Sequence, residues 1–329
     1  MVFAIRSIVL CALSLAPLNI GSVANAQSSP ALQASKYIRD VTQADVRDVV
    51  LPILRQGMQP RELEIVDRIE IRIVVDQRIG RVHAGEDANG TPIIEISTGF
   101  LSLVGSLIDA NLTGRRFGKA ELIGPYKEAV STFLKTSRQV IRDGGTSAPP
   151  EPFNKFAGIS EAQYSAFWQS REYDDQFSWW MRSALSIVLA HELGHHVFGH
   201  LDELETKSLA ERRSMEDQAD DFAIRVNWML GVNPILFSEY FLIFAMVEDG
   251  LLEGSHAPSA CRLEKFIHAG LTFSKGDQGF MSHVQKDKAL SENLSQLEYA
   301  REQLKEACED GEAMTETSIP GLFGLSLNK

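Results

Sequence analysis

Four of the chain's eight histidines lie within ten residues, in the stretch SIVLAHELGHHVFGH at 186–200. His191 and His195 are four residues apart, so on a helix their side chains differ by only ~40° around the axis and ~6 Å along it. Two imidazoles at this spacing can bind a single Zn²⁺, and Glu192 lies beside them, within reach of a water on that metal. The apolar residues before His191 indicate a buried helix, which would shield a metal site from bulk solvent.

The other two histidines of the stretch lie elsewhere on the same helical wheel. His196 is ~140° from His191 around the axis, and His200 is ~180° from it. We therefore expect both to pack or to lie in a second layer, facing away from the metal. Gly194 lacks a side chain and leaves room for another backbone to approach the helix.

A third ligand is expected from the following helix. Glu216 lies 21 residues after His195, and Asp220 shares its helical face, with the small Ala219 between them. A catalytic zinc takes three protein ligands and leaves one position open for water. We predict His191, His195 and Glu216 as ligands of one Zn²⁺ per chain, and Asp220 as hydrogen-bond acceptor for a ligand histidine. The alternative for this acidic run is a solvated helix start, which the helix dipole would favour.

The composition limits the class of protein and of partner. The chain has 329 residues, 44% of them hydrophobic, and a formal net charge of −12. It offers no basic stripe, so a nucleic-acid partner is not expected. Two cysteines outside the N-terminal segment, Cys261 and Cys308, either pair in an oxidising compartment or remain separate thiols.

The first 26 residues have the features of a secretory signal. Arg6 precedes a short apolar run, and Ala24-Asn25-Ala26 matches a small-x-small cleavage site. We expect cleavage after Ala26 and a mature protein that is periplasmic or secreted, without a stable membrane span; the alternative is an uncleaved anchor.

The elements that must position the site are mostly helical. The hydrophobic patterns predict a strand within 63–76, a hairpin turning at Asn89-Gly90, and an α+β, helix-dominated fold with a small sheet. Residues 144–158, rich in proline and glycine, are expected to form a loop. Helices are expected at 28–60, 99–112, 120–143, around the histidines, at 215–230, at 234–247 and in the C-terminal stretch SENLSQLEYAREQLKEACED.

The motifs around the predicted metal ligands resemble those of a known group of proteins. H-E-L-G-H-H followed by E-x-x-A-D resembles the gluzincin zinc metallopeptidases. It is more closely similar to the prenyl-protease and heat-shock-protease family, which has soluble periplasmic members. The stretches 81–104, 230–247 and 255–266 are also similar to that family, the last with His256 and Arg262 at the expected separation but Ala257 in place of proline. The short gap between His195 and Glu216 is closer to ImmA/IrrE-type proteases.

The resemblance implies a domain organisation and an activity. It implies a metallopeptidase domain at 27–275 with an insertion at about 111–185. The helical spacing of apolar residues in the tail, which the resemblance covers poorly, predicts a helical cap at 276–329. An edge strand would pack on the zinc helix, and the strand around 93–97 would hold a peptide by backbone pairing. Glu192 would act as general base. By the resemblance His256 would stabilise the oxyanion; the alternative is a structural histidine. The expected function is an exported zinc metalloendopeptidase with peptide or protein substrates. The alternatives are a non-cleaving, client-binding protein of the same fold and a zinc hydrolase of a non-peptide bond.

Overall fold

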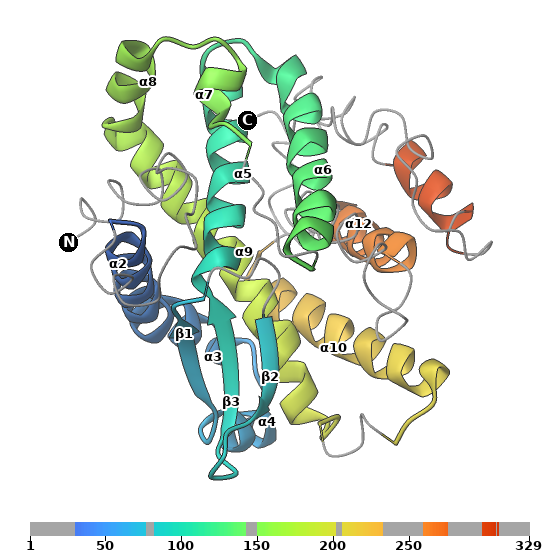
Figure 1. Ribbon diagram of the computed structural model, residues 1–329. Coiled ribbons are helices and arrows are strands. Elements are labelled where there is room, and N and C mark those ends of the chain that lie inside the picture. Colours follow the sequence, from blue (N-terminus) through green and yellow to red (C-terminus); the bar gives the residue numbers. More distant parts are fainter. Residues whose placement is uncertain are drawn as a thin grey trace. The chain divides into compact units, whose positions relative to one another are not determined.

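The computed structural model describes residues 30–76, 82–142, 150–201, 206–232, 259–275 and 298–306, together with Cys308. These residues are mostly helical and include a small mixed sheet (Figure 1), which confirms the predicted α+β, helix-dominated class. They divide into two compact units. The first contains the described residues up to Pro52 and Ile69–Leu185, and the second contains Ile53–Arg68 and those from Ser186 onward. The predicted signal segment, the helix expected at 234–247 and His256 lie outside the described residues.

The sheet belongs to the first unit and has the order β1-β3-β2 (Figure 1). Strands β1 (Glu70–Val74) and β3 (Pro92–Ser97) are parallel, and β2 (Val82–Glu86) pairs antiparallel with β3. The predicted hairpin is present, and Gly90 in its turn has φ 75°, a conformation that glycine adopts without steric cost.

The position of β3 corrects one expectation from the family resemblance. The strand at 93–97 was expected to bind a peptide through its backbone, which requires an open edge. In the structure β3 is the central strand, paired with β1 on one side and β2 on the other. Its consecutive isoleucines Ile93 and Ile94 are both buried, as is usual for a strand whose two faces are covered. Its backbone groups are therefore already engaged, and the prediction for this strand is wrong.

Helices make up the rest of the first unit. Ser97 begins α5 by accepting a hydrogen bond from the Phe100 amide through its side chain, at 3.1 Å, as expected of an N-cap serine. The segment predicted as a loop at 144–158 contains the short helix α7, whose Phe153 is buried against Tyr126. The elements are α2 (Pro30–Asp45), the π-helical η3 (Val46–Val50), the start of α3 (Leu51–Gln56), α5 (Thr98–Arg116), η4 (Ala120–Leu122), α6 (Ile123–Arg142), α7 (Phe153–Phe156), α8 (Glu161–Trp168) and the first half of α9 (Arg171–Val197).

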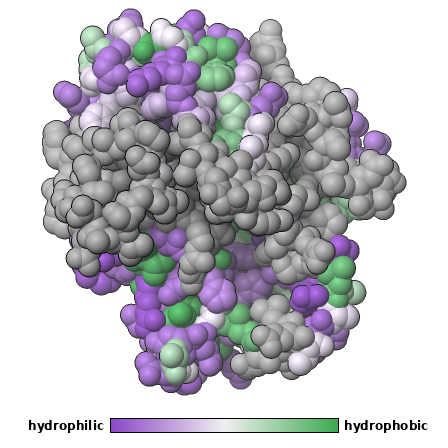
Figure 2. Space-filling model, viewed as in Figure 1, coloured by the Kyte–Doolittle hydropathy of each residue, from purple (hydrophilic) through white to green (hydrophobic). Residues whose placement is uncertain are grey.

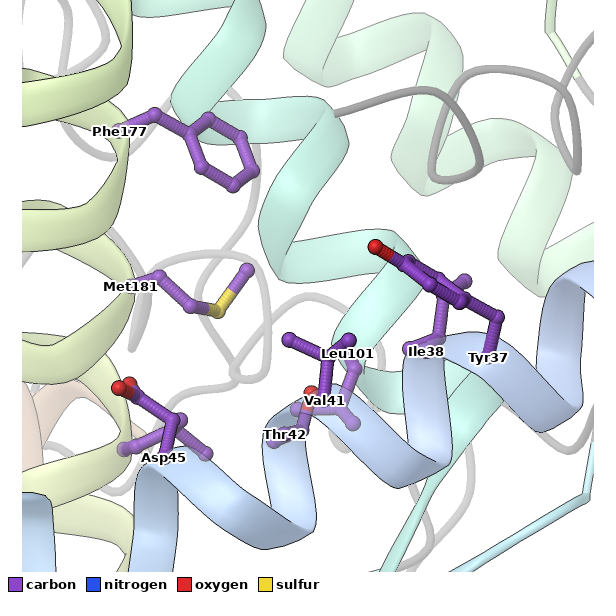
Figure 3. A pocket seen from close by; sticks show the side chains of 9 residues that line it. Tyr37, Ile38, Val41, Thr42, Asp45, Leu101, Phe177 and Met181 are labelled. Atoms are coloured by element: carbon purple, nitrogen blue, oxygen red, sulfur yellow. The ribbon is translucent and has the colours of Figure 1, made fainter. Parts of the chain in front are cut away.

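The first half of α9 is held in this unit by apolar and charged contacts. Phe177 and Met181 point from α9 toward α2 and Leu101 of α5, around a small pocket (Figure 3). Arg182, which follows Met181 on α9, forms a bidentate ion pair with Asp45 of α2, with nitrogen–oxygen distances of 2.8–3.1 Å.

The described part of the second unit contains the end of α9, helices α4, α10 and α12, and helical residues at 298–306. Helix α10 (Leu209–Met229) starts with a capping box of Ser208 and Glu211, and packs against α12 (Ser259–Lys275). Residues 298–306 are helical as predicted, and Cys308 forms a disulfide with Cys261 of α12. Helix α4 (Pro60–Val66) belongs to the same unit, and Arg225 of α10 binds Glu62 of α4 at 2.6 Å.

Hydrophilic residues predominate over the coloured part of the face in Figure 2, with hydrophobic residues scattered among them. The most exposed large apolar residues among those described include Trp179, Phe198 and Met229. No helix within the described ranges combines the length and the apolar character needed to cross a membrane.

Candidate metal centre

Helices α9 and α10 approach each other at their smallest residues. A Cβ atom added to Gly194 would lie 3.1 Å from the Ala219 Cα and 3.3 Å from the Phe222 Cβ. Both distances are tighter than ordinary van der Waals contact, so the helices could not keep this separation with a larger residue at 194. The close approach predicted from Gly194 and Ala219 is therefore present, and it brings the predicted ligands of the two helices together.

His191, His195 and Glu216 form a buried group whose ligand atoms all lie within 4.8 Å of one another. The two imidazole Nε2 atoms are 3.2 Å apart, His191 Nε2 is 3.3 Å from Glu216 Oε2, and His195 Nε2 is 3.6 Å from Glu216 Oε1. Ligands bound tetrahedrally at ~2.0–2.1 Å from zinc are separated by roughly 3.3 Å. The spacing and the donor types therefore fit one zinc ion among the three side chains.

The charges of this group also call for a cation. His191 Nδ1 lies 2.8 Å from Asp220 Oδ1, so this nitrogen carries a proton and donates it to the carboxylate. The lone pair of His191 Nε2 then faces a second imidazole nitrogen and the Glu216 carboxylate, an arrangement that only a metal ion or a second proton makes favourable. Burial lowers the pKa of His191, but hydrogen bonds to Asp220 and Glu216 outweigh it and raise the pKa to about 10. In the metal-free protein a proton on His191 thus provides the missing positive charge.

Asp220 is held from its other side by Arg262 of α12. The guanidinium donates from Nε to Oδ2 at 2.8 Å and from a terminal nitrogen to Oδ1 at 2.9 Å. Asp220 is fully buried and Arg262 is 7% exposed. Burial alone would raise the pKa of Asp220, but Arg262 and His191 hold it far below its usual value, so Asp220 remains a charged acceptor.

The acidic neighbours of Asp220 have a different partner. Asp217 and Asp221 lie on the outer side of α10 and bind Lys265 of α12, at 2.6 and 2.7 Å. They are exposed, whereas Asp220 is not. Asp220 points into the protein, whereas Asp217 and Asp221 point outward, as the helical spacing of these residues in the sequence predicts.

His200 lies in a second layer, as predicted, but on the side of His195 and not on the far side of the helix. Helix α9 ends in a Schellman motif: Gly199 has φ 69°, its amide donates to the His196 carbonyl at 3.1 Å, and the His200 amide donates to the His195 carbonyl at 3.0 Å. The chain therefore reverses at Gly199 and brings His200 back onto the helix, where its Nδ1 lies 3.0 Å from His195 Nδ1. The wheel placed His200 on the far side because it assumed that the helix continues; Gly199 near the expected helix end was the signal against this.

The two remaining predicted site residues are placed differently. Glu192 is half-buried on α9, one residue after His191, which turns its side chain ~100° from that ligand. His256 falls outside the described residues, so its predicted role stays a prediction.

Comparison of the chain with models of known protein families, with curated proteins and with solved structures finds no match.

Proposed function

We propose that the protein is a zinc-dependent metallopeptidase whose metal is held by His191, His195 and Glu216. The observation that supports this most is the convergence of two imidazole nitrogens and one carboxylate, buried and 3.2–3.6 Å apart. Three protein ligands are the number that a catalytic zinc uses when its fourth position is open to water. Glu192, on the same helix, supplies the additional carboxylate that the hydrolytic reaction needs.

The residues divide the work between binding and proton transfer. Bound zinc would lower the pKa of a coordinated water toward neutrality and polarise the scissile carbonyl. Glu192 takes the proton from the attacking water and delivers it to the leaving amine. Asp220 keeps the proton of His191 on Nδ1, so that Nε2 is directed into the site. The N-terminal 26 residues support export to the periplasm or the medium, where a disulfide such as Cys261–Cys308 persists.

The test is digestion of a peptide library by the purified protein and its Glu192→Gln variant, each with matched zinc content. We expect cleavage by the wild type that a chelator abolishes and zinc restores, and no cleavage by the variant. Zinc-dependent cleavage that survives Glu192→Gln would show that Glu192 is not the base. Retained zinc without any cleavage would favour hydrolysis of a non-peptide bond or binding of client proteins, and titration with an unfolded protein would identify the latter.

A further inference from the structure

The structure shows a specific partner for each of the two ligand histidines. His191 Nδ1 meets Asp220, and His195 Nδ1 meets His200 Nδ1 at 3.0 Å. We propose that His200 is the positioning residue of His195: it accepts the Nδ1 proton of His195 and so directs His195 Nε2 into the metal centre. This inference rests on the proposed metal site and adds a residue to it.

The tautomers follow from the direction of the hydrogen bond. A neutral imidazole that binds a metal through Nε2 carries its proton on Nδ1 and must donate it to an acceptor. At His195 the acceptor is the Nδ1 lone pair of His200, which places the His200 proton on Nε2. A ligand histidine without such a partner can rotate or change tautomer, and a metal site typically loses ~10–100-fold in affinity or activity when the partner is removed.

His200 is held rigidly enough to orient another ring. Its backbone amide is fixed by the Schellman hydrogen bond to the His195 carbonyl, and its side chain is 3% exposed. The Phe198 ring stacks on the His200 imidazole, with centroids 5.6 Å apart and 29° between the planes. The same helix terminus therefore carries the ligand at its third-last helical position and the partner two residues beyond the cap.

The chemistry of this partner differs from that of Asp220. Asp220 brings a negative charge, which Arg262 balances. An imidazole acceptor orients His195 without adding a further negative charge beside Glu216. The metal would then keep more of its positive charge, which is what lowers the pKa of a bound water.

The experiment compares four variants of the full chain at His200 and beside it. Zinc affinity is measured by competition with a chromogenic chelator, and the geometry of the site is followed by the visible absorption of the Co²⁺-substituted protein. His200→Asn places an acceptor oxygen where Nδ1 lies, whereas His200→Gln places it further out, near Nε2. His200→Phe keeps a ring for Phe198 to stack on but has no acceptor, and Phe198→Leu removes the stacking and leaves the acceptor.

We expect His200→Phe and His200→Gln to bind zinc ~10–100-fold more weakly and to change the Co²⁺ spectrum. His200→Asn should stay close to the wild type in both measurements. Phe198→Leu, which loses the stacking but keeps the acceptor, should lose less zinc affinity than His200→Phe. Equal affinity of the wild type and His200→Phe, or of the Asn and Gln variants, would overturn the role of His200 while leaving the metal centre intact. If His200→Phe does not fold, the comparison of Asn with Gln decides alone. A wild type that binds no zinc would overturn the proposed metal centre, and this inference with it.

Discussion

Replacement of Arg262 by methionine tests how the site is supported from α12. Methionine keeps much of the apolar length of the side chain and removes the charge. Asp220 is fully buried and Arg262 is 7% exposed, so the carboxylate would lose its strongest partner in a place that water cannot reach. Removal of one member of a buried ion pair costs ~3–5 kcal/mol because it leaves a buried charge uncompensated. Since His191 still faces Asp220, we expect a loss near the lower limit, about 3 kcal/mol of unfolding free energy.

The chain contains a matched control one turn further along α12. Lys265 binds Asp217 and Asp221, whose side chains are 60% and 64% exposed. Exposed pairs contribute about 0–1 kcal/mol, so Lys265→Met should change stability by no more than that. Urea titration in the presence of a chelator, followed by circular dichroism, measures both variants without metal. Equal losses of unfolding free energy for the two variants would refute the argument that burial makes the Arg262–Asp220 pair more important for stability than the exposed Lys265 pairs.

Three further predictions concern packing, pH and the metal. Gly194→Val adds atoms where a Cβ would already lie 3.1 Å from the Ala219 Cα, so it should destabilise the protein by roughly 1–3 kcal/mol and weaken zinc binding by displacing Glu216. Urea titration measures the loss of stability and chelator competition measures the loss of zinc affinity. Unchanged values in both would contradict the close packing. Burial raises the pKa of Asp109 to about 6 against hydrogen bonds from two tyrosines and a threonine, so its contribution to stability is full below pH ~4 and is lost as the pH rises through 6. Asp109→Asn should therefore gain up to roughly 3 kcal/mol over the wild type at pH 8 but not at pH 4, and parallel pH profiles of the two proteins would disprove this. Because His191 holds a proton with a pKa of about 10, zinc binding near pH 8 should release about one proton from it, which calorimetry in buffers of different ionisation enthalpy detects; buffer-independent heats would contradict this.

Local spacing allowed most of the candidate site to be predicted from the sequence. The i,i+4 pairs His191/His195 and Glu216/Asp220 each lie on one helical face, and Gly194 and Ala219 lie where two helices can approach. These conclusions need only helix geometry within an element. That Asp220 accepts a hydrogen bond from a ligand histidine also followed from the helical face that it shares with Glu216.

The features that the sequence did not predict depend on where an element ends or on long-range pairing. The contact of His200 with His195 was not predicted, because Gly199 ends α9 and reverses the chain. The central position of β3 depends on its pairing with β1, from which β2 separates it in the sequence, and local alternation does not encode strand order. Arg262 reaches Asp220 across 42 residues, and no periodicity in the sequence relates the two.

Metal analysis of the purified wild type beside His195→Ala and Glu216→Ala tests the central claim most directly. The three ligands converge on one position, so we predict one zinc per wild-type chain and a loss of zinc in both variants after dialysis against a weak chelator. The same zinc content in the wild type and either variant would show that the metal, if bound, is not held by this group. A wild type without zinc after loading and dialysis would contradict the metal centre as a whole.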